Sequence, residues 1–225
     1  EYSMMTLARM LGMNVPAVDL VDIDEIGGLP KDVSALPGKA FVIERFDRLS
    51  DGSAVHTEDF AQIFGVYPRD KYKKASAANI ANVIAIESDQ DDMREFIRRL
   101  TFNTLIGNAD MHLKNWSMYY PDRRVARLAP AYDFLSTIPY IPDNETALKC
   151  SRTRRFDEFN EAELIHLAGR AGIPKTLVLD VAKETTELFH QHWQAEKNHL
   201  PIYRDAVVKI DRHLAVVPFA VNLNS

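Results

Sequence analysis

Apolar residues recur every three or four positions in several stretches of this chain, which is the spacing of one helix face. The clearest case is residues 91–106, where acidic residues gather at the start and Arg98 and Arg99 come later, as the helix dipole favours. Thr57, followed by two acidic residues, predicts the N-cap of a short helix. The other predicted helices cover residues 2–11, 60–64, 75–87, 160–171, 175–198 and 201–214.

Other stretches have the patterns of β-strands. Polar and apolar residues alternate over 18–23, residues 40–47 are mostly apolar, and a Gly- and Pro-rich turn at 27–38 lies between them. Further on, residues 116–120 and 125–128 flank a Pro-Asp-Arg-Arg turn and predict a β-hairpin. The mixture predicts an α+β protein whose second half is mainly helical.

A polar segment follows the helix predicted at 91–106, and it carries Asp110 and Asn115 five positions apart. A second acid, Asp133, comes one predicted hairpin later. Phosphoryl transfer needs a carboxylate that receives or orients the proton of the attacking hydroxyl, and it needs oxygen ligands for Mg²⁺. The order therefore predicts Asp110 as the catalytic base, and Asn115 and Asp133 as the metal ligands.

Lys114 and His112 lie inside the same polar segment and are further candidate catalytic residues. Lys114 is placed to reach the transferring phosphoryl group. His112 has two open interpretations, a catalytic role or a hydrogen bond that orders the loop. An Asp five residues before an Asn also arises by chance, so the catalytic hypothesis depends on the helix before it and the hairpin after it.

A second candidate site lies at the end of the second predicted strand, in the sequence Glu44-Arg45-Phe46-Asp47. In a two-lobed kinase this segment would be the hinge. Backbone groups of Glu44 and Phe46 would then bind the adenine of ATP, and Asp47 would reach the ribose. The alternative is a strand end followed by a surface turn, which is the better interpretation when the segment is taken alone.

The order of predicted elements is typical of the kinase-like fold without the first part of its small lobe. Residues 1–47 would be the remaining part of the N-terminal lobe and the hinge. Residues 48–225 would form the C-terminal helical lobe, with the catalytic loop at 108–115 and a metal-binding segment at 131–135. Residues 135–158 predict a long irregular stretch.

Composition limits the class of protein. The 225 residues are 46% hydrophobic and 26% charged, which suits a globular protein with a real core. The net charge of −5 argues against general affinity for nucleic acid or anionic membranes. The only cysteine, Cys150, points to a reducing compartment, and no apolar run reaches about 18 residues. We therefore expect a cytoplasmic protein with no membrane partner.

Three groups of residues together resemble the HipA-like serine/threonine kinases, the toxin components of bacterial toxin–antitoxin pairs. They are Glu-Arg-Phe-Asp-Arg at 44–48, the catalytic-loop sequence Asp110-x-His112-x-Lys114-Asn115, and Tyr132-Asp133. The similarity spans most of the chain, beginning with Leu-Ala-x-x-Leu-Gly-x-Asn-Val-Pro at 7–16. This resemblance implies a protein-kinase-like fold of the HipA type, with a partial small β lobe followed by a large mainly helical lobe.

The resemblance also implies roles for individual residues. Asp110 matches the family's catalytic aspartate, and Asn115 and Asp133 match its two Mg²⁺-binding residues. Glu44 and Phe46 match the adenine-binding hinge, with Asp47 near the ribose. The family's phosphate-gripping lysine and autophosphorylated serine loop would both precede residue 1, so we expect a missing N-terminal portion.

The activity that the resemblance implies is transfer of phosphate from ATP to a serine or threonine of a protein target, reported for the family as aminoacyl-tRNA synthetases. Blocked translation, growth arrest and persistence would follow. The implied partner is a HipB-like helix-turn-helix antitoxin, through which the toxin would contact DNA only indirectly.

Two alternatives remain open from the sequence. The first is a small-molecule phosphotransferase resembling aminoglycoside or choline kinases, which a strongly acidic acceptor pocket near Asp110 would favour. The second is a non-catalytic pseudokinase or truncated toxin that only binds its antitoxin.

Overall fold

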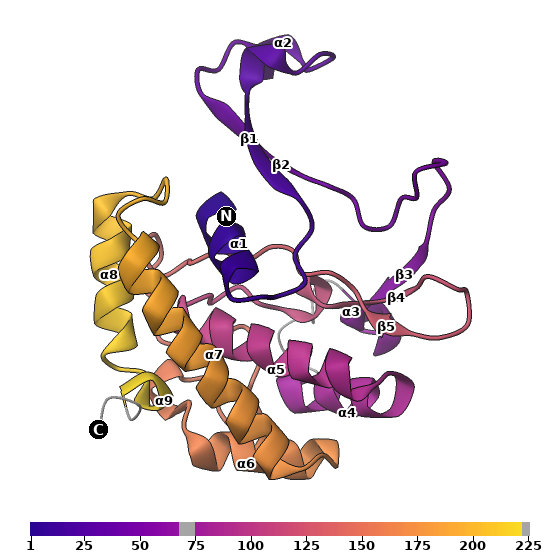
Figure 1. Ribbon diagram of the computed structural model, residues 1–225, viewed down its shortest axis with the longest axis vertical. Helices are drawn as coiled ribbons and strands as arrows, with labels where there is room; N and C mark the ends of the chain where they lie inside the picture. Colours follow the sequence, from indigo (N-terminus) through magenta and orange to yellow (C-terminus); the bar gives the residue numbers. More distant parts are fainter. Residues whose placement is uncertain (68–74, 222–225) are drawn as a thin grey trace.

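The computed structural model describes residues 1–67 and 75–221 of the chain. Helix α5 (Gln90–Leu105) lies at its centre, with helix α7 packed across it (Figure 1). Asp89 caps α5, because its Oδ1 accepts hydrogen bonds from the backbone N–H groups of Asp91 and Asp92, each at 3.1 Å. Every residue from 99 to 105 is buried, so the second half of this helix is covered on all sides.

Most of the remaining helices pack around α5 in one continuous hydrophobic core. Trp116 and Trp193 lie in that core at 3% and 0% exposure. No helix in the described part of the chain has the length and apolarity that crossing a bilayer requires. The helices that share this core with α5 are α1 (Tyr2–Met10), α4 (Ala77–Glu87), α6 (Glu161–Ala171), α7 (Lys175–Glu196), α8 (Arg204–Leu214) and α9 (Pro218–Val221).

Strands β1 (Val18–Asp22) and β2 (Lys39–Ile43) form an antiparallel ribbon that projects away from the helical body (Figure 1). Val18 lies opposite Ile43, and Asp22 lies opposite Lys39. Both strands were predicted from their patterns. The segment between them is more ordered than a simple turn, because it contains a 3₁₀ turn (Ile23–Glu25) and the short helix α2 (Lys31–Ser34).

The second sheet has the order β3-β4-β5, formed by His56–Asp59, Ser117–Tyr120 and Arg127–Leu128. The predicted hairpin is confirmed as β4 and β5. The predicted N-cap at Thr57 is wrong, because Thr57 lies in β3 opposite Tyr119. Asp59 caps α3 (Phe60–Ile63) instead, in a reciprocal pair of hydrogen bonds with Gln62 at 2.8 and 2.9 Å.

The segment from 135 to 158 is mostly irregular, as predicted, with one 3₁₀ turn (Phe156–Glu158). Its backbone is nevertheless held by isolated bridges that pair Ser76 with Lys149 and Glu145 with Arg155. The helix predicted at 201–214 begins later than expected, at Arg204.

Candidate active site

The predicted catalytic loop begins where α5 ends. Gly107 turns the chain with a φ of +66°, a conformation that favours glycine. The side chain of Asn108 then bonds in two directions: its Nδ2 donates to Asn103 Oδ1 at 2.8 Å, and its Oδ1 accepts from the Asp110 N–H at 3.1 Å. These bonds place Asp110 at the surface, directly beyond a rigid helix end.

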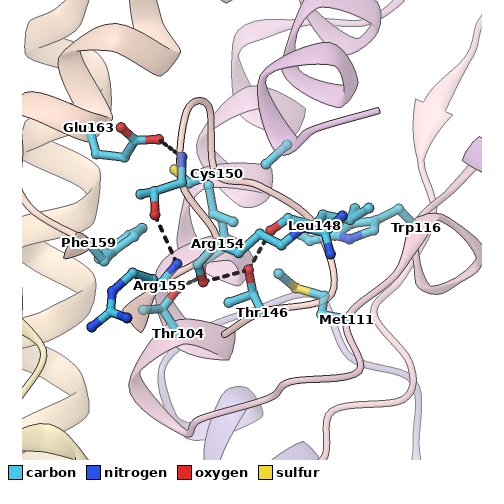
Figure 2. Close-up of a pocket in the computed structure, with 13 residues that line it drawn as sticks. Thr104, Met111, Trp116, Thr146, Leu148, Cys150, Arg154, Arg155, Phe159 and Glu163 are labelled. Carbon is cyan, nitrogen blue, oxygen red and sulfur yellow. Dashed lines mark hydrogen bonds between the residues drawn. The ribbon is translucent and has the colours of Figure 1, made fainter. Parts of the chain in front are cut away.

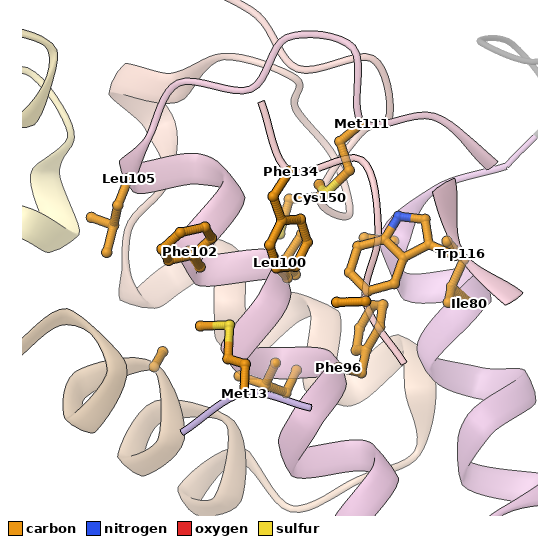
Figure 3. Close-up of a cluster of buried hydrophobic side chains, with 14 of the residues drawn as sticks. Met13, Ile80, Phe96, Leu100, Phe102, Leu105, Met111, Trp116, Phe134 and Cys150 are labelled. Atoms are coloured by element: carbon orange, nitrogen blue, oxygen red, sulfur yellow. The ribbon is translucent and has the colours of Figure 1, made fainter. Parts of the chain in front are cut away.

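Apolar side chains anchor both halves of the site in the core. Figure 3 shows Met111 and Phe134 beside Phe102 and Trp116 in the central hydrophobic cluster. The rings of Phe102 and Phe134 lie 5.2 Å apart between centroids. Because Met111 follows Asp110 and Phe134 follows Asp133, the core fixes the backbone on which both acids stand.

Asn115 and Asp133 are brought into direct contact, although 18 positions separate them: Asn115 Nδ2 donates to Asp133 Oδ2. The Oδ1 atom of Asn115 accepts the His112 N–H at 2.9 Å, which closes the loop around the 3₁₀ turn Leu113–Asn115. Asp133 adopts a φ of +62°, a conformation rare for residues other than glycine and often retained at functional sites. The side chains of the two predicted metal ligands therefore lie side by side.

The residues fit Mg²⁺ better than a softer metal. Within residues 1–67 and 75–221, His, Cys, Asp and Glu side chains form no group of three or more that could hold a metal ion. Asn115 and Asp133 would supply two oxygen ligands and leave the remaining positions to phosphate oxygens and water. Mg²⁺ commonly binds in this way, through one or two protein oxygens together with substrate phosphates.

His112 and Lys114 occupy different surroundings. The side chain of His112 is 9% exposed and lies beneath the loop, whereas Lys114 faces solvent. The Lys114 carbonyl accepts a hydrogen bond from the Tyr132 hydroxyl at 2.9 Å. The surroundings of His112 suit a loop-ordering role and those of Lys114 suit contact with a phosphoryl group, and both roles stay predictions.

Tyr132 joins the parts of the site, a role that the sequence analysis missed. Its hydroxyl donates to the Lys114 carbonyl and lies 2.5 Å from Ser117 Oγ. Burial raises its pKa to about 12, so the hydroxyl stays protonated and keeps donating at neutral pH. The ring of Phe46 stacks on Tyr132 with centroids 6.0 Å apart, so this tyrosine also connects the predicted hinge to the metal-binding segment.

The predicted hinge follows β2 without a break. The Glu44 N–H donates to the Ala17 carbonyl at 2.8 Å, which extends the pairing of β1 and β2. Its carbonyl, rather than its N–H, is therefore the group that would meet adenine. Asp47 is half-buried and forms ion pairs with Arg45 at 2.6 Å and Arg48 at 2.8 Å, and these pairs hold the pKa of its carboxyl below the usual range.

Glu1 lies beside Asp133, although nothing in the sequence predicted that contact. The Glu1 carboxylate lies close enough to Asp133 for that residue's charge and backbone to act on the pKa of Glu1. Burial and the nearby charge of Asp133 raise the pKa of Glu1 above its ordinary value. The carboxylate at the N-cap of α1 thus lies beside the predicted metal-binding segment.

A cavity of about 550 Å³ opens beside Asp110. Three of the side chains that line it are acidic and one is basic, and the others are apolar or neutral. The lining residues are Ala109, Asp110, Leu135, Thr137, Ile141, Asp143, Glu145, Thr146, Ala147 and Arg154. An acceptor that brings a hydroxyl to Asp110 would have to occupy this space.

The wall behind that cavity is a folded-back segment. Figure 2 shows Thr146 beside Arg154, and the Thr146 N–H donates to the Arg154 carbonyl at 2.8 Å. Glu163 from α6 accepts hydrogen bonds from the backbone N–H groups of Ser151 at 2.8 Å and Arg152 at 2.6 Å. The cavity is thus backed by a hydrogen-bonded frame.

Comparison with known proteins identifies the family of this chain. Residues 1–193 match the family model of the HipA-like C-terminal domain. The chain belongs to this HipA-like family. It is 53% identical over 218 residues to "Putative kinase Y4dM" of Sinorhizobium fredii, which covers 96% of this chain and 53% of that protein.

More distant relatives extend the comparison. The chain is 27% identical over 207 residues to "Serine/threonine-protein kinase toxin HipA" of Shewanella oneidensis, covering 80% of this chain and 43% of that protein. A protein of Haemophilus influenzae named "Putative kinase" is 35% identical over 150 residues, with 41% of its length covered. The chain therefore spans about half the length of the curated relatives it matches.

Solved structures show the same fold. The HipA chain in a Shewanella oneidensis complex of HipA, HipB and operator DNA superposes with a TM-score of 0.75 and 22% identity, covering 99% of this chain and 57% of that one. The Helicobacter pylori proinflammatory kinase CtkA superposes with a TM-score of 0.57 and 13% identity, covering 87% of that chain. The HipA-like chain thus has the α+β kinase-like fold that its sequence predicted.

Proposed function

We propose that this HipA-like chain carries the catalytic half of an ATP- and Mg²⁺-dependent serine/threonine protein kinase, the toxin of a HipBA-type toxin–antitoxin system. The observation that carries the proposal is the meeting of Asn115 and Asp133 beside a loop that presents Asp110 to solvent. The three residues come from two separate segments, and a phosphotransferase needs them together.

In the proposed reaction, Asp110 accepts or orients the proton of the acceptor hydroxyl. The oxygen of that hydroxyl forms a bond to the γ-phosphorus of ATP as the bond from this phosphorus to the β-γ bridging oxygen breaks, and ADP leaves. Asn115 and Asp133 would hold Mg²⁺, which neutralises charge on the phosphates when it is bound. Lys114, exposed on the same loop, would steady the transferring group.

The proposed hinge would hold the nucleotide. The carbonyl of Glu44 and the N–H of Phe46 would bind adenine, and Asp47 would meet the ribose. Stacking of Phe46 on Tyr132 supports this arrangement, because it ties the adenine end of the site to the segment that would hold the metal.

The proposed partners follow from the relatives. One solved relative is a complex of HipA with HipB and operator DNA. We propose a HipB-like antitoxin for this protein as well, with DNA contacted only through it. The proposed target is an aminoacyl-tRNA synthetase, whose phosphorylation would inhibit translation in the cytoplasm and arrest growth.

Calorimetry of the full-length protein with ATP and Mg²⁺ tests the proposal. Saturable binding that needs Mg²⁺ is expected, and Asp133→Ala is expected to weaken it at least about tenfold, since it removes a metal ligand. Asp143→Ala, an exposed acid outside the predicted metal site, is the matched control. Absence of nucleotide binding by the intact wild-type protein would leave a non-catalytic antitoxin-binding module as the better account.

One observation favours a second candidate. The cavity beside Asp110 is acidic, as a phosphotransferase acting on a cationic small molecule would need. Transfer of phosphate to an aminoglycoside or choline-like acceptor, and not to any protein, would establish that candidate.

A further inference from the structure

A second large cavity, of about 500 Å³, lies between the segment that leads into β3 and the turn that joins β4 to β5 (Figure 1). We propose that it binds a small ligand in which a phosphate group is attached to an aromatic or apolar group. Arg123 and Arg124 would hold the phosphate, and His56 and Tyr120 would contact the rest. The cavity shares no residue with the site proposed for ATP, so the inference does not rest on the kinase function.

Charge is the first argument. Arg123 and Arg124 line the cavity, whereas no acidic residue in the described part of the chain does so. This is a local reversal in a chain whose net charge is −5. Asp51, the acid nearest in sequence to the opposite wall, accepts the Ser53 hydroxyl at 2.6 Å within its own turn. An anion that enters the cavity would therefore meet a surplus of positive charge.

The guanidinium groups of these two arginines are also free to bind a ligand. Both side chains are exposed, and neither forms an ion pair with a carboxylate within residues 1–67 and 75–221. Arg127, further along the same hairpin, pairs instead with Asp89 and Asp92. A guanidinium without a carboxylate partner can donate two parallel, charge-assisted hydrogen bonds to the oxygens of a phosphate group.

The turn that carries the arginines is held by its own hydrogen bonds. Asp122 Oδ1 accepts the N–H groups of Arg124 at 2.9 Å and Val125 at 2.8 Å. The Arg123 N–H donates to the Tyr120 carbonyl at 3.0 Å. Arg123 has a φ of +63°, a left-handed conformation that is unfavourable for a residue with a side chain and is often retained at functional sites. Donors fixed in this way bind an anion with less loss of entropy than mobile ones.

The opposite side of the cavity offers aromatic and apolar surface. The rings of His56 and Tyr120 lie 5.4 Å apart between centroids, and the Tyr120 hydroxyl donates to Glu58 Oε2 at 3.1 Å, which fixes its ring. Leu49, which is 52% exposed, extends this surface. Sites for small molecules combine such surface with a few polar groups, in cavities of about 300–1,000 Å³.

Backbone hydrogen bonds fix this wall. The Val55 N–H donates to the Asp47 carbonyl at 3.0 Å, and the Leu49 N–H donates to the Ser53 carbonyl at 2.9 Å. The cavity is therefore formed before any ligand arrives, as small-molecule sites usually are.

Ligand-observed NMR of the full-length protein tests the inference, with phenyl phosphate as the probe and saturating MgADP present to occupy the proposed nucleotide site. Saturable binding is expected, and added salt should weaken it. Arg123→Gln with Arg124→Gln is expected to weaken binding at least about tenfold, because the charge-assisted hydrogen bonds are lost. Inorganic phosphate, which lacks the ring, should bind at least about threefold more weakly than phenyl phosphate.

The matched control is Arg204→Gln with Arg212→Gln, which removes the same charge from exposed positions of α8. It should bind phenyl phosphate as the wild type does, and thermal unfolding checks that both variants stay folded. Unchanged affinity in the folded variant of Arg123 and Arg124, or no binding by the wild type, would overturn the inference. Equal affinity for benzyl alcohol, which has a ring and no phosphate, would overturn it as well.

A parallel arm distinguishes a free ligand from a phosphorylated protein segment. A phosphotyrosine peptide presents the same phenyl phosphate group within a chain. Peptide affinity no more than about tenfold above that of phenyl phosphate supports a small ligand. A larger gain, lost in the variant of Arg123 and Arg124, would overturn that assignment in favour of a phosphorylated partner.

Discussion

At the scale of single residues, Arg99 is a buried charged side chain behind the candidate site, where it lines a small cavity together with Asn115 and Asp133. It is 3% exposed, and its Nε donates to Glu95 Oε1 at 2.7 Å while Nη1 donates to the Ala129 carbonyl at 2.7 Å. Glu95 in turn accepts the Asn14 N–H at 2.9 Å. This buried pair therefore ties α5 to the strand end that leads into Tyr132.

Arg99→Met is expected to lower the free energy of unfolding by about 3–5 kcal/mol, because it leaves the buried Glu95 carboxylate without its hydrogen-bonded cation. Urea denaturation measures the change. Arg98→Met is the control on the neighbouring position: its guanidinium is 29% exposed and lies 4.0 Å from two carboxylates, so its loss should cost less than about 1 kcal/mol. Equal costs for the two variants would contradict the assignment.

His213 predicts a pH dependence of stability. Burial lowers its pKa below the ordinary value of about 6.5, and its Nε2–H donates to the Thr104 carbonyl at 2.7 Å. The folded protein therefore holds the neutral ring, whereas the unfolded chain takes up a proton first as the pH falls. Stability from this group is complete above about pH 6.5 and is lost as the pH falls toward the lower folded pKa.

His213→Gln keeps a donor near Thr104 and removes the titration. Its free energy of unfolding is expected to fall less steeply than that of the wild type between about pH 7 and pH 5. Urea denaturation at several pH values measures the two slopes. His199 faces solvent, so its replacement by glutamine is the matched control. Parallel slopes for wild type and His213→Gln would exclude this histidine as the source.

At the scale of elements, the junction between α5 and the predicted catalytic loop is tightly constrained. Gly107 has a φ of +66°, and a Cβ there would lie 2.7 Å from Ile138 Cγ1. Gly107→Ala is expected to cost about 2–4 kcal/mol of stability, from the left-handed conformation and from overpacking together. Thermal unfolding measures the loss.

Gly169→Ala is the control for Gly107→Ala. It lies within α6 with open space around it, and an alanine there should stabilise the protein by up to about 1 kcal/mol. A small effect of Gly107→Ala would mean that the loop tolerates a shift of Ile138.

The same elements explain what the sequence could predict. The central helix has a local pattern, so it was found with nearly correct bounds. Strand β3 was missed because His56–Asp59 is short and polar, and it becomes a strand only by pairing with β4. The cap at Asp59 was misplaced for the same reason, since Thr57 offers an equally good capping side chain in the absence of the sheet.

Contacts between segments that are distant in the chain could not be predicted from the sequence. The sequence indicated only that Arg99 suits the helix dipole, whereas the structure buries its guanidinium against Glu95 and the Ala129 carbonyl. The contact of Glu1 with Asp133 joins the two ends of a long stretch of chain. Neither contact leaves a periodic pattern, because both arise only when segments pack together.

At the scale of the whole molecule, Phe46 connects the projecting ribbon of β1 and β2 to the helical body. It stacks on Tyr132 and meets Tyr119 edge-on with centroids 6.1 Å apart. Phe46→Ala is expected to cost about 1–3 kcal/mol of local packing, and so to speed cleavage by trypsin within residues 18–45. Limited proteolysis followed by mass spectrometry measures the rate.

Tyr140→Ala removes an aromatic ring that is 64% exposed and is the control for Phe46→Ala. It should leave cleavage of the ribbon unchanged. An unchanged rate in Phe46→Ala would mean that the segment after β2 is held by its backbone hydrogen bonds alone.

The single cysteine has a practical consequence. Cys150 is buried, and burial raises the pKa of its thiol, so it reacts slowly with alkylating dyes while the protein stays folded. A second cysteine placed at Leu36, which is 56% exposed near the tip of the ribbon, would be labelled selectively without any change to Cys150. A fluorophore there would report movement of the ribbon when nucleotide is added.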